Sequence, residues 1–215
     1  MEQEHTGDGP HGAPSSRADR AKRRQIMEGA QRMFLAQGFD AASMNEIARA
    51  AGVSKGTLYV YFKSKEELFE AIVEAQCRAQ GEEIFALDPE ADIAGELTRL
   101  GVGFSRFLTR PGGLSEVRTV IAIAERMPEL GAKFYQAGPA FGIDSLKSYL
   151  EAKVAAGVLE PHDCEIAAAQ FIDACVSTTF KPMLFNRSGP PTDERVALVV
   201  SMAVRAFLAA YASKR

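Results

Sequence analysis

Two short helical segments that meet at a glycine, between Ser43 and Phe62, constrain the fold of this chain most strongly. Their sequence is SMNEIARAAGVSKGTLYVYF. Ser43 and Glu46 have the spacing of a capping box, which begins a helix, and Gly52 permits the positive φ that a tight corner needs. Ser54 then caps a second helix. Two short helices joined by such a corner indicate a helix-turn-helix.

The rest of the chain also shows the apolar spacing of helices. Apolar residues recur three and four positions apart, and no segment has the alternating pattern of a strand, so the sequence predicts an all-α fold. Proline, glycine and cap residues separate the further helices, which we expect over about 26–37, 64–76, 93–108, 114–126, 128–156, 163–185 and 193–212. Gly138-Pro139 is expected to interrupt the helix over 128–156.

Composition and pattern divide the chain into a tail at residues 1–18, a helix-turn-helix domain at 19–66 and a second helical domain at 67–215. Residues 1–16 contain almost no apolar side chain and are rich in Gly, Pro, Ser and charge, which favours disorder. They lack the apolar core of a signal peptide, and no stretch reaches the roughly 20 apolar residues needed to span a bilayer. We therefore expect a cytoplasmic protein with no membrane partner.

Charge is distributed unevenly along the chain. The segment from Arg17 to Lys65 holds ten Lys or Arg and four acidic residues, a net charge of +6. The remaining residues must then carry −9, because the whole chain has a formal net charge of −3. A basic segment beside an acidic remainder favours a polyanion as the partner of the N-terminal part.

The second helix of the motif is expected to lie in a DNA major groove with its first residues near base edges. Lys55 can donate to guanine, the methyl group of Thr57 can touch thymine, and Gly56 lets the DNA approach closely. Other hydroxyl and ammonium groups suit phosphates. Some hydroxyls could instead serve only as caps, and one of the two tyrosines could simply pack. The predicted DNA contacts are Ser43, Ser54, Lys55, Gly56, Thr57, Tyr59, Tyr61 and Lys65.

The run IARAAGVSKGTLYVYFKSKEELFEAIVEA resembles the DNA-binding domain of the TetR/AcrR family of bacterial repressors, over about Arg23 to Glu74. Carried over by position, the resemblance implies the same eight DNA contacts. The C-terminal part, with Arg118, Glu125, MPEL at 127–130 and FYQAGP at 134–139, is similar to the AefR-like subgroup. The resemblance further implies a C-terminal helical domain that binds a small molecule and forms a homodimer.

The last helix is apolar on almost every side. From Val196 to Tyr211 only Ser201 and Arg205 are polar. A helix of this kind is buried all round, so one face should pack on its own domain and the other on a second copy. Complete burial inside a monomer is the alternative. The predicted dimer contacts are Val196, Val200, Ala203 and Phe207.

Aromatic and Met side chains on the middle helices suit an apolar pocket, and they suit an ordinary core equally. The break at Gly138-Pro139 could open a cavity among them. Asp173 is a candidate polar anchor because its neighbours are apolar. The predicted ligand contacts are Phe104, Phe107, Met127, Phe134, Tyr135, Phe141, Phe171, Asp173 and Cys175.

The three cysteines, Cys77, Cys164 and Cys175, have neither zinc-ligand nor disulfide-framework spacing. We expect unreactive thiols, with redox sensing by Cys175 as the alternative. His162-Asp163-Cys164-Glu165 follows a proline and is interpreted as a helix start rather than a metal site. No Gly-rich phosphate loop or nucleophile–base set occurs, so we expect no enzyme, no metal and no cofactor.

These features favour a ligand-responsive transcriptional repressor. We expect a homodimer that binds a near-palindromic operator in double-stranded DNA and is released by a small apolar or aromatic effector. A ligand-independent architectural DNA-binding protein is the alternative. A helical enzyme that retains a vestigial DNA-binding head is disfavoured by the missing catalytic groups.

Overall fold

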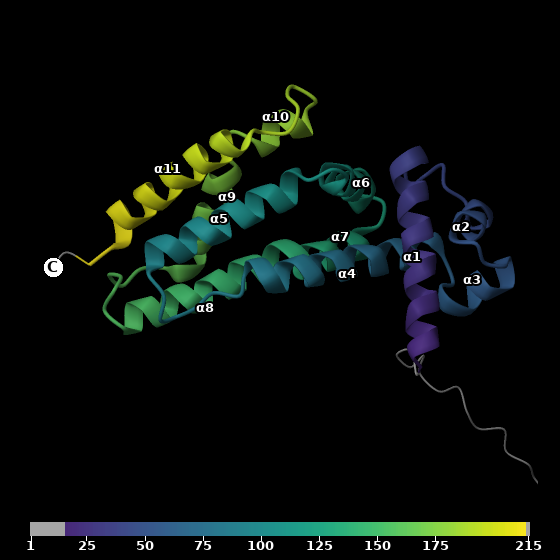
Figure 1. Ribbon diagram of the computed structural model, residues 1–215, viewed down its shortest axis with the longest axis horizontal. Helices are drawn as coiled ribbons and strands as arrows, with labels where there is room; N and C mark the ends of the chain where they lie inside the picture. Colours follow the sequence, from purple (N-terminus) through teal and green to yellow (C-terminus); the bar gives the residue numbers. More distant parts are fainter. Residues whose placement is uncertain (1–15, 214–215) are drawn as a thin grey trace, which may run out of the picture. The chain divides into compact units, whose positions relative to one another are not determined.

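The computed structural model describes residues 16–213 (Figure 1). Most of the predicted tail lies outside the described residues, but α1 begins at Arg17, two residues inside the predicted tail. Within 16–213 the fold is all-α, and the only β pairing is an isolated antiparallel bridge between Leu159 and Ala212. The helices are α1 (Arg17–Gln37), α2 (Met44–Ala51), α3 (Lys55–Tyr61), α4 (Lys65–Ile84), α5 (Ile93–Thr109), α6 (Gly113–Ala124), α7 (Pro128–Tyr135), the π-helix η1 (Gln136–Ala140), α8 (Phe141–Ala155), α9 (Cys164–Val176), α10 (Phe180–Leu184) and α11 (Asp193–Tyr211).

The chain separates after Phe69 into two compact units. This division lies inside α4, three residues beyond the boundary that the sequence predicts. The first unit contains the helix-turn-helix, and the second contains the remaining helices.

The first unit packs α1 against α2 at very short range. A Cβ added to Gly29 on α1 would lie 2.6 Å from the Cα of Ala51, so only glycine allows this crossing. Phe34, Phe39 and Phe69 form a ring cluster with centroids 5.2 to 5.5 Å apart. This core holds the helix-turn-helix in position.

The second unit is built around the mutual packing of α5, α8, α9 and α11. Its core contains Leu97, Leu146, Phe171 and Val200, each almost fully buried. The region predicted as one helix over 163–185 consists of α9 and α10, because the helix is interrupted between Val176 and Phe180.

The helix over 128–156 is not broken at Gly138-Pro139. Instead α7 continues through η1 into α8, and Pro139 lies inside the π-helical turn. A π turn widens the helix locally, and proline can be accommodated there although it supplies no N–H donor. The predicted irregularity does lie at Gly138-Pro139, but it is a π-helical turn and not a break in the helix.

The prediction of four dimer contacts on α11 selected the wrong face of the helix, the one that packs on its own domain. Val196, Val200, Ala203 and Phe207 all lie in the core of their own chain. The side chains that α11 leaves accessible include Leu198 and Met202, which are 54% and 48% exposed. The apolar pattern was correct, but it could not distinguish the two faces.

Candidate nucleic-acid interface and effector cavity

The capping box of α2 is confirmed. The hydroxyl of Ser43 accepts the backbone N–H of Glu46 at 3.3 Å, and the Glu46 carboxylate accepts the backbone N–H of Ser43 at 3.1 Å. The Ser43 hydroxyl also donates to this carboxylate at 2.7 Å. Hydrogen bonds from Ser43 lower the pKa of Glu46. The hydroxyl is thus engaged within the helix start, and its contact with DNA stays a prediction.

The turn between α2 and α3 follows the sequence prediction. Gly52 adopts φ 65° and ψ 38°, the left-handed region that glycine tolerates without strain. Ser54 caps α3 by accepting the backbone N–H of Thr57 at 3.0 Å, and the two hydroxyl oxygens lie 2.8 Å apart. Both hydroxyls therefore serve the first turn of α3.

The accessible face of α3 consists of Lys55, Gly56, Tyr59 and Val60. Positions 55 and 59, and positions 56 and 60, lie one helical turn apart, whereas Leu58 points into the core. The Lys55 ammonium lies 5.9 Å from the centroid of the Tyr59 ring. This face presents one cation, one phenol and one aliphatic group to a partner.

Sequence reasoning missed Val60, whose exposed fraction of 78% is among the largest of the apolar residues. The exposure of Val60 could have been predicted from its position, because Val60 follows the core residue Leu58 by two positions and so lies on the opposite side of the helix. An exposed aliphatic side chain at this point can contact a thymine methyl group.

Two of the predicted phosphate contacts are engaged in contacts within the first unit. The Tyr61 hydroxyl donates to the Asp19 carboxylate at 2.8 Å, which raises the pKa of Tyr61. The Lys65 ammonium donates to the carbonyl oxygens of Phe39 at 2.9 Å, Asp40 at 3.1 Å and Ala42 at 3.4 Å. An ammonium has three N–H donors, so the geometry favours support of the loop before α2.

An aromatic cavity of about 380 Å³ lies in the second unit. It brings together six of the nine predicted ligand contacts: Phe104, Phe107, Phe134, Tyr135, Phe141 and Asp173. Phe85 and Phe180 add two rings that are not among the nine predicted ligand contacts. A cavity of this size and lining is suited to a small aromatic molecule.

The other three predicted ligand contacts do not line this cavity. Phe171 packs in the core with its ring centroid 5.6 Å from that of Phe207. Cys175 is fully buried, and burial raises the pKa of its thiol to about 12. Its sulfur occupies the space beside Gly101, where an added Cβ would approach it to 2.8 Å. Met127 immediately precedes α7 and is not part of the cavity lining.

The polar groups of the cavity are few. Arg110 pairs with Glu116 at 2.8 Å, donates to the carbonyl oxygen of Phe107 at 2.7 Å and donates to Gln76 at 3.4 Å. Asp173 is the remaining charged residue of the lining. The Arg110–Glu116 pair is neutral as a unit, so the lining as a whole carries one negative charge.

Sequence profiles of known families match both units. Residues 26–72 match "Bacterial regulatory proteins, tetR family", and residues 95–213 match "AefR-like transcriptional repressor, C-terminal domain". The chain belongs to the TetR family of transcriptional regulators. The second match covers more than half of the chain and confirms the resemblance seen in the sequence.

Several relatives of this TetR-family chain are similar over most of their length. YhgD of Bacillus subtilis, an HTH-type transcriptional regulator, is 25% identical over 180 residues, which cover 80% of this chain and 88% of YhgD. The crystal structure of a TetR-family regulator from Mesorhizobium loti is 30% identical, with a TM-score of 0.85 over 93% of this chain and 100% of that one. The flavonoid-responsive regulator FrrA is 31% identical, with a TM-score of 0.78 over 91% and 99%.

Within residues 16–213 of this TetR-family chain, no group of three or more His, Cys, Asp or Glu is placed to hold a metal ion. Asp163 caps α9 by accepting the backbone N–H groups of Glu165 and Ile166, as the sequence predicts for a helix start. None of the described helices is long and apolar enough to cross a membrane.

Proposed function

We propose that this chain is a ligand-responsive transcriptional repressor that binds a near-palindromic operator as a homodimer and is released by a small aromatic effector. The aromatic cavity of about 380 Å³ carries this proposal. A purely architectural DNA-binding protein has no need of such an apolar pocket, and pockets of this size and lining are typical of small-molecule sites.

The accessible face of α3 supports the DNA-binding part of the proposal. Lys55 is suited to guanine, Gly56 to close approach, and Val60 to a thymine methyl group. The hydroxyl of Tyr59 suits a phosphate or a base edge. We retain Ser43, Ser54, Thr57 and Tyr61 as proposed contacts of lower rank, because each already holds a partner within the first unit. For Lys65 we propose support of the loop before α2 in place of the phosphate contact, because its ammonium donates to three carbonyl oxygens.

A homodimer is supported by the apolar residues that the second unit leaves uncovered. Leu198 and Met202 on α11 and Ile166 on α9 are about half exposed. Because α9 and α11 pack together, two copies can join these helices as a four-helix interface under two-fold symmetry. Two heads then meet half-sites about one helical turn of DNA apart.

An aromatic effector is supported by the rings of the cavity and by the similarity to FrrA, which is described as flavonoid-responsive. Release requires that the effector bind more tightly to a state of the dimer that fits the operator poorly, and the loss of DNA affinity equals this difference. The flavonoid naringenin is therefore a suitable first probe.

The test begins with selection of binding sites from random DNA by the full-length protein. Fluorescence anisotropy then measures operator affinity with and without naringenin. We expect a palindromic consensus and at least a tenfold loss of affinity with the probe. Binding equal to that of random DNA at moderate salt would overturn the operator model in favour of the architectural one.

A cavity variant supplies the control. Phe104→Trp enlarges a side chain of the lining far along the chain from α3. We expect this variant to bind operator as the native protein does and to lose its response to naringenin. A response equal to that of the native protein would place the effector elsewhere.

A further inference from the structure

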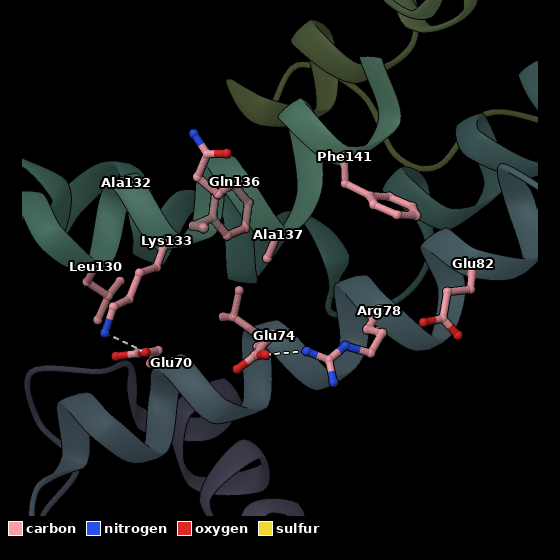
Figure 2. Close-up of a pocket in the computed structure, with 12 residues that line it drawn as sticks. Glu70, Glu74, Arg78, Glu82, Leu130, Ala132, Lys133, Gln136, Ala137 and Phe141 are labelled. Carbon is pink, nitrogen blue, oxygen red and sulfur yellow. Dashed lines mark hydrogen bonds and ion pairs between the residues drawn. The ribbon is translucent and has the colours of Figure 1, made fainter. Parts of the chain in front are cut away.

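A second hollow, a groove of about 570 Å³, lies along α4 from Glu70 onwards, against α7 and η1 (Figure 2). Four charged side chains of α4 follow one another along its edge, and Lys133 reaches over from α7 to Glu70 at 2.7 Å. Its lining is Glu70, Val73, Glu74, Arg78, Glu82, Leu130, Ala132, Lys133, Phe134, Gln136, Ala137 and Phe141.

The groove and the aromatic cavity share part of their walls. Val73, Phe134, Ala137 and Phe141 line both. These four side chains therefore form a wall that the groove and the cavity share. A molecule that passes this wall moves from solvent into the cavity without crossing the packed core.

Phe141 is the side chain of this wall best placed to open and close the passage. It is 37% exposed, and Figure 2 shows its ring on the side of the groove where α4 carries Arg78 and Glu82. Its ring packs edge-on against Phe85, with centroids 6.2 Å apart. It also covers the bare backbone of Gly81, where an added Cβ would lie 3.2 Å from the ring.

The backbone beside Phe141 is suited to movement. The π turn from Gln136 to Ala140 immediately precedes it and contains Pro139, which lacks an N–H donor. π turns are less regular than α-helix and recur at functional sites, and kinks concentrate at such points. A small shift of this turn displaces Ala137 and Phe141 together, because Ala137 lies in the turn and Phe141 directly follows it. Both residues belong to the shared wall.

The charges on this route disfavour anions. In the groove, Lys133 pairs with Glu70 and Arg78 pairs with Glu74, which leaves Glu82 as the uncompensated charge of the lining. In the cavity lining the remaining charge is that of Asp173, an exposed residue at the edge of the rings. An anionic ligand would lose its water there without gaining a free cation, which is costly.

We propose that this groove is the entrance to the effector cavity, that Phe141 closes it, and that the route admits neutral or cationic aromatic molecules in preference to aromatic anions. This inference rests on the proposed function, since it assumes that the aromatic cavity is the effector site. It adds to that site the route by which the effector enters and the charge of the effectors that the route admits.

The path is tested by binding kinetics of N-phenyl-1-naphthylamine, a neutral aromatic probe that becomes fluorescent in apolar surroundings, on the full-length protein. Ala132→Trp places a large ring in the groove, and Ala132 does not line the cavity. We expect at least tenfold slower association and dissociation with a dissociation constant within about twofold of native. Ala122→Trp, on an exposed alanine of α6 that lines neither space, is the matched control and should leave both rates unchanged.

Unchanged rates in Ala132→Trp, with native helicity by circular dichroism, would overturn the entrance. If Ala132→Trp loses helicity, the kinetics are measured instead on Gln136→Trp, which fills the same groove from an exposed position. Phe104→Trp should abolish probe binding at equilibrium, and probe binding that survives it would show that the probe does not enter the cavity.

The charge class is tested with 1-anilinonaphthalene-8-sulfonate, a similar ring system that carries a negative charge. We expect at least tenfold weaker binding than that of the neutral probe. In Glu82→Lys the association rate of the anion should rise several-fold at low salt while that of the neutral probe stays the same. Equal affinity for the two probes in the native protein would overturn the selectivity.

These outcomes can be separated from failure of the proposed function. Failure of the proposed function appears as DNA binding without sequence preference or without response to any aromatic compound. Failure of the entrance appears in probe kinetics, with operator binding and release intact.

Discussion

Replacement of Lys65 by alanine should destabilise the helix-turn-helix without changing how DNA affinity depends on salt. The Lys65 ammonium donates to the carbonyl oxygens of Phe39 and Asp40 at 2.9 and 3.1 Å, with a weaker bond to Ala42 at 3.4 Å. It also lies 4.7 Å above the ring of Phe39. These contacts hold the loop that leads into α2.

The magnitude follows from these contacts. A hydrogen bond to a charged group contributes about 1.5–3 kcal/mol when well sheltered, and less where water can replace it. Two short bonds at a half-buried site contribute about 1 kcal/mol each, and the cation–π contact adds about 0.5 kcal/mol. We therefore expect Lys65→Ala to lower the local free energy of unfolding by about 2–3 kcal/mol.

Amide hydrogen exchange on the full-length protein measures this loss locally. Amides of α2 and α3 should exchange about 30- to 140-fold faster, because 1.4 kcal/mol corresponds to a factor of ten. Amides of α5 and α11 should be unchanged. Lys63→Ala, two positions away on an exposed lysine, is the control and should leave α2 protected.

The reasoning is refuted if Lys65→Ala leaves exchange unchanged while the slope of log affinity against log salt falls by about one unit. That pair of results is the signature of a lost phosphate contact, which the sequence alone had suggested. Unchanged exchange and unchanged slope would show that the three carbonyl contacts contribute nothing, and would refute it equally.

Three further predictions concern the dimer face, the buried thiol and the DNA-reading face. Leu198→Glu should give a folded monomer in sedimentation analysis because the side chain is accessible, whereas Val200→Glu should fail to fold because it places a charge in the core; a stable dimer of either variant would contradict these assignments. Cys175 should resist iodoacetamide at pH 8 in the folded protein and react only in denaturant, since its pKa is raised to about 12 by burial; labelling in the folded state, detected by mass spectrometry, would reopen its role as a redox sensor. Val60→Ala should weaken operator binding about two- to fivefold and leave the slope of log affinity against log salt unchanged. Replacing the contacted thymine by uracil should remove the difference in affinity between the variant and the native protein. Equal losses of affinity on both DNAs would exclude a methyl contact.

The helix-turn-helix could be predicted from the sequence because its determinants are local. Ser43 and Glu46 are three residues apart, Ser54 and Thr57 likewise, and each pair forms the hydrogen bonds that its spacing implies. The positive φ of Gly52 is a property of one residue. Interactions over three or four residues survive in any fold that keeps the helix, so tertiary packing did not overrule them.

The partner of Lys65 could not be predicted in the same way. Its acceptors lie 23 to 26 positions earlier in the chain, and backbone carbonyls carry no mark in the sequence. A basic residue near a helix start looks the same whether it meets a phosphate or a carbonyl cluster. The face of α11 posed a related difficulty, because a helix with apolar residues all round has two candidate interfaces and no polar stripe to tell them apart.

The aromatic residues of the second unit show where the limit lies. Phe104 and Phe171 are identical side chains on neighbouring helices, yet Phe104 lines the cavity while Phe171 is sealed against Phe207. The difference arises from what faces each ring, and that depends on the crossing of several helices. Gly81 and Gly142 matter as much as the rings, because their bare backbones make room for Phe141 and Phe85. A cavity is thus specified by small residues on the helices opposite the large ones, and a search that begins from aromatic residues alone finds core and pocket together.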